Sequence, residues 1–323
     1  MIRVGFVLLT HSHPGQVLRL VRALNELYDA PPIVCHHDFG QCALDRSQFP
    51  DHAAFVDPHL TTFWGCFSIV PAALSAMRML MNGKNPPDWL YLLSGSDYPA
   101  VSPDKVVSTL AQTRFDAFID HRAITYAGYT GAGRSKGPDD ATGFSRRSYM
   151  AVAYRRYCAV AVPRPALQKP WAFPPVGHSY LYHPAWRALV PGPFSSNFRC
   201  YAGEHWFTVR NKAASILLNG TIQSRRLLAH LRHRESPEEC FYHSLLGNSP
   251  LEVSSNNLRY IHWPSPDAWH PSTLSLDHLP EISNSGAHFA RKIAPGSPLL
   301  VELDRITGIS QSSFATRISF ANS

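Results

Sequence analysis

The chain has 323 residues, of which 45% are hydrophobic and 11% aromatic, and this composition excludes a disordered or low-complexity protein. Lysine and arginine number 30 against 23 aspartates and glutamates, which gives a formal net charge of +7. Because the excess is spread along the chain without a long basic block, it favours a small anionic substrate over nucleic acid. No segment reaches about 18 uninterrupted apolar residues, so no transmembrane helix is predicted.

The N-terminal part predicts an open α/β sheet. "RVGFVLLTH" (3–11) is a continuous apolar run, typical of a strand buried on both faces, and residues 14–29 carry apolar side chains at helical spacing. "PPIVCHHDFG" (31–40) supplies a second strand. Strand, helix and strand in this order predict a parallel pair, with ligands beyond the carboxyl ends of the strands. We therefore expect His11 and Asp38 at the ligand-binding edge.

Further elements follow along the chain. "SIVPAALSAMRMLMNG" (68–83) predicts a helix with Gly83 as its stop, and residues 88–112 predict a strand, a polar turn and a helix. Residues 202–220 predict a strand that leads into a helix. The predicted fold class is therefore α/β, with an open, mostly parallel sheet flanked by helices.

The rest of the chain is less regular. Residues 126–174 are rich in Gly, Arg, Tyr and Pro and have weak periodicity, which predicts long surface loops that carry binding function. We expect one catalytic domain over residues 1–303. Residues 304–323 are polar and Ser-rich, and we expect a partly mobile C-terminal tail.

The cysteines and the first residues bear on the compartment. The six cysteines form no C-x-x-C pair and lie in mostly apolar surroundings, which is typical of reduced, buried thiols in a cytosolic protein. The apolar run in "MIRVGFVLLTHSHPG" is too short for a signal peptide. We expect a soluble, cytoplasmic protein.

Two adjacent acids open the stretch "SPEECFYHSLLGNSP". Ser236 as N-cap, Pro237 at the first helical position and Glu239 three residues after the cap predict a capping box, which explains the pattern without catalysis. Glu238 and Glu239 would lie about 100° apart on a helix. If one of them faces a cleft, we expect the other to be solvated.

Three more stretches carry candidate site residues. Asp97 ends the buried strand of "YLLSGSDYPA", either as an ordinary turn residue or as the acid of a nucleotide-sugar site. Arg291 and Lys292 in "NSGAHFARKI" are a solvated pair or a clamp that neutralises a diphosphate in place of a metal. Trp263 is a core residue or an exposed platform for a sugar ring.

Histidines are frequent, with 17 in the chain. The clusters "HSH" (11–13) and "HHD" (36–38) lack the spacing of known zinc sites, so no metal site is predicted.

The order of these stretches is more specific than any one of them. "WG-x-x-S" (64–68) is followed by "LLSGSDYP", "GEHWFTVRN", "SPEECFYHSLLGNS", "NLRYIHW" and "HFARKI". From about Val4 to Lys292 the chain resembles glycosyltransferase family 14. This family comprises the core-2/I-branching β-1,6-N-acetylglucosaminyltransferases and the peptide O-xylosyltransferases, and the later motifs resemble the xylosyltransferases more closely.

The resemblance implies a GT-A-type fold and an inverting transfer from a UDP-sugar without metal or other cofactor. It implies that Glu239 is the general base and that Arg291 and Lys292 hold the diphosphate. The other positions that it implies are His11, Asp38 and Gly65 on the nucleotide side, and Asp97, Trp206 and Trp263 in the donor and acceptor cleft, with Trp263 contacting the acceptor.

The expected reaction moves xylose or N-acetylglucosamine to a hydroxyl of a glycan or peptide, for example in a bacterial surface polysaccharide. The eukaryotic relatives carry a membrane anchor, a stem and disulfides that this sequence does not show, so we expect a cytosolic, bacterial enzyme. Peripheral association with anionic lipids is compatible with the basic charge, although no amphipathic helix supports it. The alternatives are a non-catalytic sugar- or nucleotide-binding module and a His-based, metal-dependent hydrolase. Donor identity, acceptor linkage and oligomeric state stay open.

Overall fold

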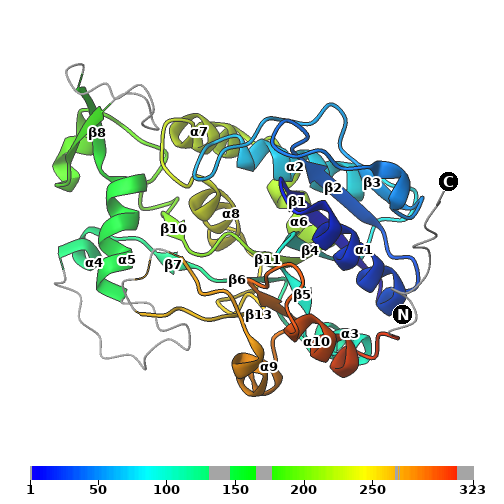
Figure 1. Cartoon of the computed structure of the whole chain (residues 1–323). Helices are drawn as coiled ribbons and strands as arrows, with labels where there is room; N and C mark the ends of the chain where they lie inside the picture. The colour runs from blue at the N-terminus through cyan, green and yellow to red at the C-terminus, as the bar shows by residue number, and fades with distance from the viewer. Residues whose placement is uncertain (1, 131–145, 165–176, 266–267, 269, 311–323) are drawn as a thin grey trace.

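The computed structural model describes residues 2–130, 146–164, 177–265, 268 and 270–310. Within these ranges a seven-stranded sheet has the order β12-β6-β11-β4-β1-β2-β3 (Figure 1). Its strands are β12 (Val253–Ser254), β6 (Ala117–Ile119), β11 (Phe207–Arg210), β4 (Trp89–Ser94), β1 (Val4–Thr10), β2 (Ile33–His37) and β3 (Ala53–Phe55). Strand β1 is parallel to β2 and β4, β2 is parallel to β3, and β11 is antiparallel to β4 and β6. The predicted open, mostly parallel sheet is confirmed.

Smaller sheets and helices surround this sheet. The smaller sheets are β13 (Arg259–Ile261) with β14 (Phe289–Arg291) and β5 (Tyr98–Pro99), β10 (Tyr201–Ala202) with β7 (Arg122–Ala123), and β8 (Val160–Arg164) with β9 (Gly177–Leu181). The α-helices are α1 (Pro14–Tyr28), α2 (Ile69–Met81), α3 (Pro103–Gln112), α4 (Tyr126–Thr130), α5 (Arg146–Ala153), α6 (Asn211–Leu218), α7 (Ile222–Leu231), α8 (Glu238–Gly247), α9 (Leu279–Ser285) and α10 (Leu299–Thr307). Short 3-10 turns lie at Arg46–Gln48, Pro184–Ala188 and Leu276–His278, and a π-turn lies at Tyr154–Cys158.

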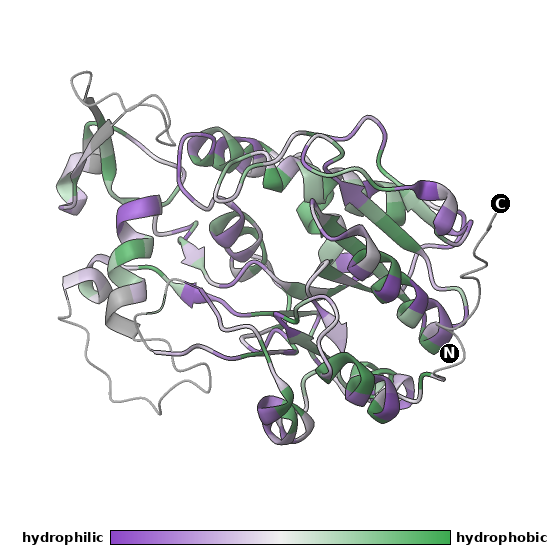
Figure 2. Ribbon diagram, viewed as in Figure 1, coloured by the Kyte–Doolittle hydropathy of each residue, from purple (hydrophilic) through white to green (hydrophobic). Residues whose placement is uncertain are grey.

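The strands of the large sheet are mainly apolar because both faces of the sheet are covered. Val7 of β1 joins a buried cluster with α2, α6, α7 and α8, whereas its neighbours Phe6 and Leu8 join a second cluster with α1, α3 and α10. Successive side chains of a strand point to opposite faces, so a strand between two helical layers needs apolar residues at every position. Figure 2 shows the consequence, with apolar central strands and helices of mixed hydropathy.

The structure corrects two predictions about irregular regions. Residues 126–174 were expected to form loops, but the described part contains α4, α5, the π-turn and β8. The tyrosines of this region explain the order, because Tyr154 and Tyr157 are buried and Tyr154 stacks on Tyr129. Helix α2 ends at Met81, and its cap, Asn82, lies one residue before the predicted stop at Gly83. The remainder of the loop prediction falls on residues 131–145 and 165–174, outside the described residues.

The C-terminal helix belongs to the folded domain. Asp304 of α10 is 1% exposed, accepts a hydrogen bond from Tyr98 Oη (2.7 Å) and pairs with Arg19 of α1. Helix α10 thus continues past the predicted domain boundary at residue 303, and Ile309 is also buried. The rest of the predicted tail, residues 311–323, lies outside the described residues.

We expect Asp304→Ala to lower the free energy of unfolding by about 1–3 kcal/mol, because it leaves the buried Tyr98 hydroxyl without an acceptor. Urea unfolding of wild type, Asp304→Ala and a control variant measures the change in the free energy of unfolding. Glu302→Ala is the matched control on the exposed side of α10, where a change within about 0.5 kcal/mol is expected. Equal midpoints for the two variants would contradict a structural role of Asp304.

Two findings concern membranes and thiols. In the described part of the chain no helix is both long and apolar enough to cross a bilayer. All six cysteines carry free thiols, and five of them are buried, in agreement with the expected reduced state. Cys200 Sγ and Cys240 Sγ lie 3.9 Å apart in the core beneath α8.

Candidate active site

The start of α8 is fixed by contacts with distant segments. Ser236 has a φ of +47°, and Pro237 occupies the cap position without a side-chain cap, so the predicted capping box is wrong. Ser236 N–H donates to the carbonyl of Gly65 (2.9 Å), and the Ser236 carbonyl accepts from Tyr157 Oη (2.7 Å). Gly65 itself has a φ of +68°, which favours glycine. The first turn of α8 is therefore held by the 64–68 loop and the π-turn.

This support places the Glu239 carboxylate at a partly open position. Its side chain is 29% exposed, and its Oε2 lies 3.2 Å from Arg156 Nη1. Arg156 is also paired with Glu235 (3.3 Å), which leaves its charge shared between two acids. Burial raises the pKa of Glu239 and the nearby Asp120 adds to this, whereas Arg156 acts in the opposite direction. A raised pKa makes a carboxylate a better proton acceptor.

Glu238 has a different environment from Glu239. It is 6% exposed, and burial, with the adjacent charge of Glu239, raises its pKa to about 8. Glu238 is therefore mainly protonated at neutral pH. The expectation that the second glutamate would be solvated is wrong, because the first turn of α8 is packed against the rest of the domain.

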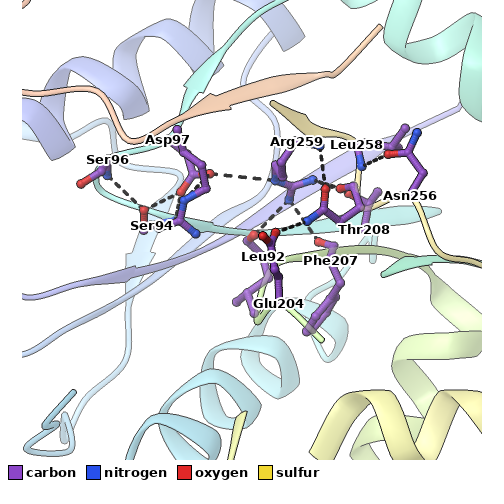
Figure 3. Close-up of polar contacts among 12 residues, drawn as sticks. Leu92, Ser94, Ser96, Asp97, Glu204, Phe207, Thr208, Asn256, Leu258 and Arg259 are labelled. Carbon is purple, nitrogen blue, oxygen red and sulfur yellow. Dashed lines mark hydrogen bonds and ion pairs between the residues drawn. The ribbon is translucent and has the colours of Figure 1, made fainter. Parts of the chain in front are cut away.

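Asp97 forms a buried charge cluster with Arg259 and Arg291, and Figure 3 shows Asp97 and Arg259. The Asp97 side chain is fully buried, and its Oδ2 accepts hydrogen bonds from the Ser94 amide (2.7 Å) and the Ser94 hydroxyl. Its Oδ1 lies 3.9 Å from Arg259 Nε and 4.0 Å from Arg291 Nε. Asp97 thus provides a counter-charge that both arginines share.

Arg259, which the sequence analysis did not single out, is the structural member of the cluster. Its Nη1 donates to Thr208 Oγ1 (3.0 Å) and its Nη2 donates to the carbonyls of Leu92 (3.0 Å) and Phe207 (3.2 Å), as Figure 3 shows. These bonds tie β13 to β4 and β11. A buried cation with both terminal nitrogens hydrogen-bonded is typical of a structural residue.

Arg291 has more unused donors than Arg259, in which only Nε lacks a hydrogen-bond partner within the described residues. It is 5% exposed, and its guanidinium lies over the Trp206 ring at 4.1 Å from the centroid. Within the described residues, Arg291 Nε and Nη1 have no hydrogen-bond partner. A buried guanidinium with unused donors is suited to bind an anion. Lys292 is half-buried beside it, and burial followed by the charge of Arg291 lowers the pKa of Lys292.

The segment 203–206, called here the bridging segment, contacts both Glu239 and Arg291. Gly203 N–H donates to the Glu239 backbone carbonyl (3.0 Å). The ring of Trp206 packs against the Arg291 guanidinium. Position 203 requires glycine because an added Cβ would lie 1.7 Å from the Asp120 carbonyl oxygen. The bridging segment therefore positions Glu239 and Arg291 relative to each other.

Glu204 in the bridging segment was missed by the sequence analysis. Its Oε2 accepts from Asn257 Nδ2 (2.8 Å) and its Oε1 accepts from Trp263 Nε1 (3.2 Å). Trp263 is partly exposed, so it is not a fully buried core residue. The only signal for Glu204 in the sequence is an acid beside the aromatic pair of "GEHWF", which is too weak to choose it.

The residues assigned to the nucleotide side lie where β1 and β2 end. Asp38 N–H donates to the Thr10 carbonyl (2.9 Å), which places Asp38 beside exposed His11. Burial opposes ionisation of Asp38, but hydrogen bonds from Thr62, Gln41 and Gly40 hold its pKa at about 2. Asp38 therefore organises the loop at 59–62, whereas Gly65 contacts the start of α8.

The histidine clusters make local contacts. His36 Nε2 accepts from the Leu60 amide (2.9 Å), and His37 Nε2 lies 2.7 Å from the Cys42 carbonyl oxygen. Among the described residues no group of three or more His, Cys, Asp or Glu side chains is arranged to hold a metal ion.

Comparisons with known proteins identify relatives of this chain. A family model described as "Core-2/I-Branching enzyme" matches residues 44–293. The Arabidopsis thaliana protein Beta-glucuronosyltransferase GlcAT14B is 22% identical over 311 residues, which are 94% of this chain and 62% of the relative. Beta-glucuronosyltransferase GlcAT14A from the same plant is 24% identical over 251 residues, 76% of this chain and 48% of the relative. The chain thus spans about half to three fifths of the length of these relatives. The apo structure of the bifunctional glycosyltransferase WbbM is similar with a TM-score of 0.40 and 7% identity, covering 95% of this chain and 52% of that one.

Proposed function

Because the chain belongs to the core-2/I-branching family of glycosyltransferases (family 14), we propose that it is an inverting, metal-independent enzyme that transfers a sugar from a UDP-sugar to a hydroxyl group. The acceptor is a glycan or a peptide. The observation that carries this proposal is the bridging segment, which bonds the backbone of Glu239 and packs against Arg291. The Glu239 carboxylate is partly exposed, and the buried Arg291 guanidinium has unused donors.

Glu239 acts as the general base in this proposal. An acceptor hydroxyl is a weak nucleophile, so a carboxylate must take its proton while the bond to the anomeric carbon forms. A single base is enough for inversion, because the hydroxyl attacks directly on the face opposite the departing UDP. Arg156 holds the Glu239 carboxylate in one orientation, which favours a preorganised site.

Arg291 and Lys292 stabilise the departing diphosphate. The charge that develops on UDP needs donors that are already in place, and Arg291 is held by Trp206 and Asp97 before any ligand arrives. A divalent ion does not fit at Asp97, since its carboxylate already faces Ser94 and two guanidinium groups. We therefore propose that the two cations take the place of a metal.

Three donor sugars are candidates. The motifs at 236–250 and 287–293 favour xylose or N-acetylglucosamine, and the names of the two plant relatives add glucuronic acid. The three UDP-sugars share the UDP moiety that Arg291 and Lys292 would bind, so UDP binding tests the proposal before the sugar is known.

The test is UDP binding by calorimetry, together with slow hydrolysis of UDP-xylose, UDP-N-acetylglucosamine and UDP-glucuronate, each in EDTA and in Mn²⁺. We expect UDP to bind in EDTA and one donor to be hydrolysed at a rate that Mn²⁺ changes by less than about twofold. Hydrolysis that requires Mn²⁺ would contradict metal independence. Absence of UDP binding under both conditions would contradict the transferase proposal itself.

A further inference from the structure

Glu204 is an acidic side chain near the proposed site. The proposed reaction assigns it no role. Glu204 lies in the bridging segment, between the glycine that contacts the Glu239 carbonyl and the tryptophan that carries Arg291. Both of its carboxylate oxygens accept hydrogen bonds, one from Asn257 and one from the indole of Trp263. Figure 3 shows Glu204 next to the Arg259 network.

The charged and titratable groups around Glu204 come from several elements. Asp120 follows β6 and its Oδ2 accepts from the Glu204 amide (3.4 Å), and Arg259 of β13 and Arg291 of β14 interact with the Glu204 charge. His243 Nε2 of α8 bonds the Glu204 carbonyl (2.9 Å). Burial of His243 lowers its pKa to about 3, so it stays neutral near pH 7.

Trp263 is constrained at its ring by a hydrogen bond to a distant part of the chain. It lies two residues after β13 and is followed by exposed Pro264, so the backbone on one side is open. A sugar stacks on an indole only if the plane of the ring is held toward the cleft. The bond from Trp263 Nε1 to Glu204 fixes one edge of that ring.

We propose that Glu204 is a positioning residue that fixes the indole of Trp263 as the platform for the acceptor sugar. This inference rests on the proposed function, because it assigns Trp263 to the acceptor side of the same cleft. Glu204 also links this platform to the proposed donor-binding residues. Trp206, two residues away in the chain, packs its ring against the Arg291 guanidinium.

The chemistry explains why glutamate, and not glutamine, suits this position. Two N–H donors point at the side chain, and a carboxylate offers an acceptor to each. Glutamine has one acceptor oxygen and one NH2 group, so a donor would face a donor in either orientation. Protonation of Glu204 creates a similar conflict. Burial, with the charge of Asp120, raises the pKa of Glu204 to about 7, so the conflict arises as the pH falls below neutral.

The indole N–H resonance of Trp263 tests the contact in the intact 323-residue chain. Nuclear magnetic resonance of 15N-tryptophan-labelled protein assigns the resonance by its absence in Trp263→Phe. We expect it to shift with pH, with a midpoint near the pKa of about 7 assigned to Glu204. In Glu204→Gln it should move to a new position and stop titrating in this range. Glu252→Gln, an exposed glutamate, is the control and should leave the titration unchanged. A resonance that is the same in wild type and Glu204→Gln overturns the proposal.

Activity separates positioning from other roles. With p-nitrophenyl β-D-galactopyranoside and p-nitrophenyl β-D-glucopyranoside as acceptors, we expect Glu204→Gln to raise the acceptor KM about 3–10-fold, as expected for one lost hydrogen bond, with kcat within about threefold. UDP affinity and donor hydrolysis should stay within about twofold. A tenfold loss of UDP affinity with an unchanged indole resonance would assign Glu204 to the phosphate side and overturn the proposal. If neither glycoside is an acceptor, the resonance decides. Failure of wild type to bind UDP would contradict the proposed function and leave the Glu204–Trp263 contact to be judged by the resonance alone.

Discussion

Glu239→Gln is expected to lower the rate of glycosyl transfer and of donor hydrolysis by about 10²–10⁴-fold, the usual contribution of a general base. Glutamine has nearly the same shape and still accepts a hydrogen bond from Arg156, so the start of α8 should be retained. UDP affinity should stay within about twofold, because the proposed ligands of the diphosphate are Arg291 and Lys292, not Glu239. Steady-state hydrolysis of the active UDP-sugar, with UDP calorimetry on the same preparations, measures both quantities.

The adjacent glutamate supplies a matched control. Glu238 is buried with a pKa raised to about 8, so the wild-type side chain is mainly the neutral acid at pH 7. Glutamine resembles that neutral acid in size and polarity, and Glu238→Gln should leave the rate within about threefold. If Glu238→Gln lost as much activity as Glu239→Gln, the loss would reflect damage to the first turn of α8, and the assignment of Glu239 as the base would be contradicted.

The fold was predictable because the hydrophobic pattern of each strand and helix depends mainly on which of its own faces are buried. Strands β1 and β4 lack charged residues and are hydrophobic or glycine up to their last residues, Thr10 and Ser94, and that is the sequence pattern of strands covered on both faces. The order of the motifs identified the family, which the match over residues 44–293 confirms. The same resemblance selected Glu239, Arg291 and Trp263. The structure places all three around the bridging segment, and their roles stay predictions.

What the sequence did not predict depends on contacts between distant residues. The capping box at Ser236 is a sound local pattern, but bonds to Gly65 and Tyr157 hold Ser236 at positive φ. Arg259 is isolated in the sequence, and its partner Leu92 lies 167 residues away. Glu204 is separated by 59 residues from Trp263. No spacing rule within a helix or strand can anticipate such pairs.

Arg291→Met is expected to weaken UDP binding about 10–100-fold, because a charge-assisted hydrogen bond contributes about 1.5–3 kcal/mol. It should also lower the rate of donor hydrolysis by about 10²-fold, since a preorganised donor to the leaving group acts most strongly in the transition state. Methionine matches the length of the arginine stem and can stay on the Trp206 ring. Asp97 keeps its bonds to Ser94 and its contact with Arg259, so the variant leaves no buried acid without a partner.

One further variant separates charge from geometry at position 291, and a variant at a distant arginine is the control. Arg291→Lys retains the charge but lacks the planar group that lies over Trp206, and an intermediate loss of UDP affinity is expected. Arg305→Met removes an arginine that is 70% exposed on α10 and should leave UDP affinity within about twofold. Calorimetry with UDP and thermal unfolding of all three variants give affinity and fold integrity together. If Arg291→Met bound UDP as tightly as wild type, the unused donors of Arg291 would not be the diphosphate site. Lys292, the half-buried cation beside it, would then have to hold the leaving group without Arg291.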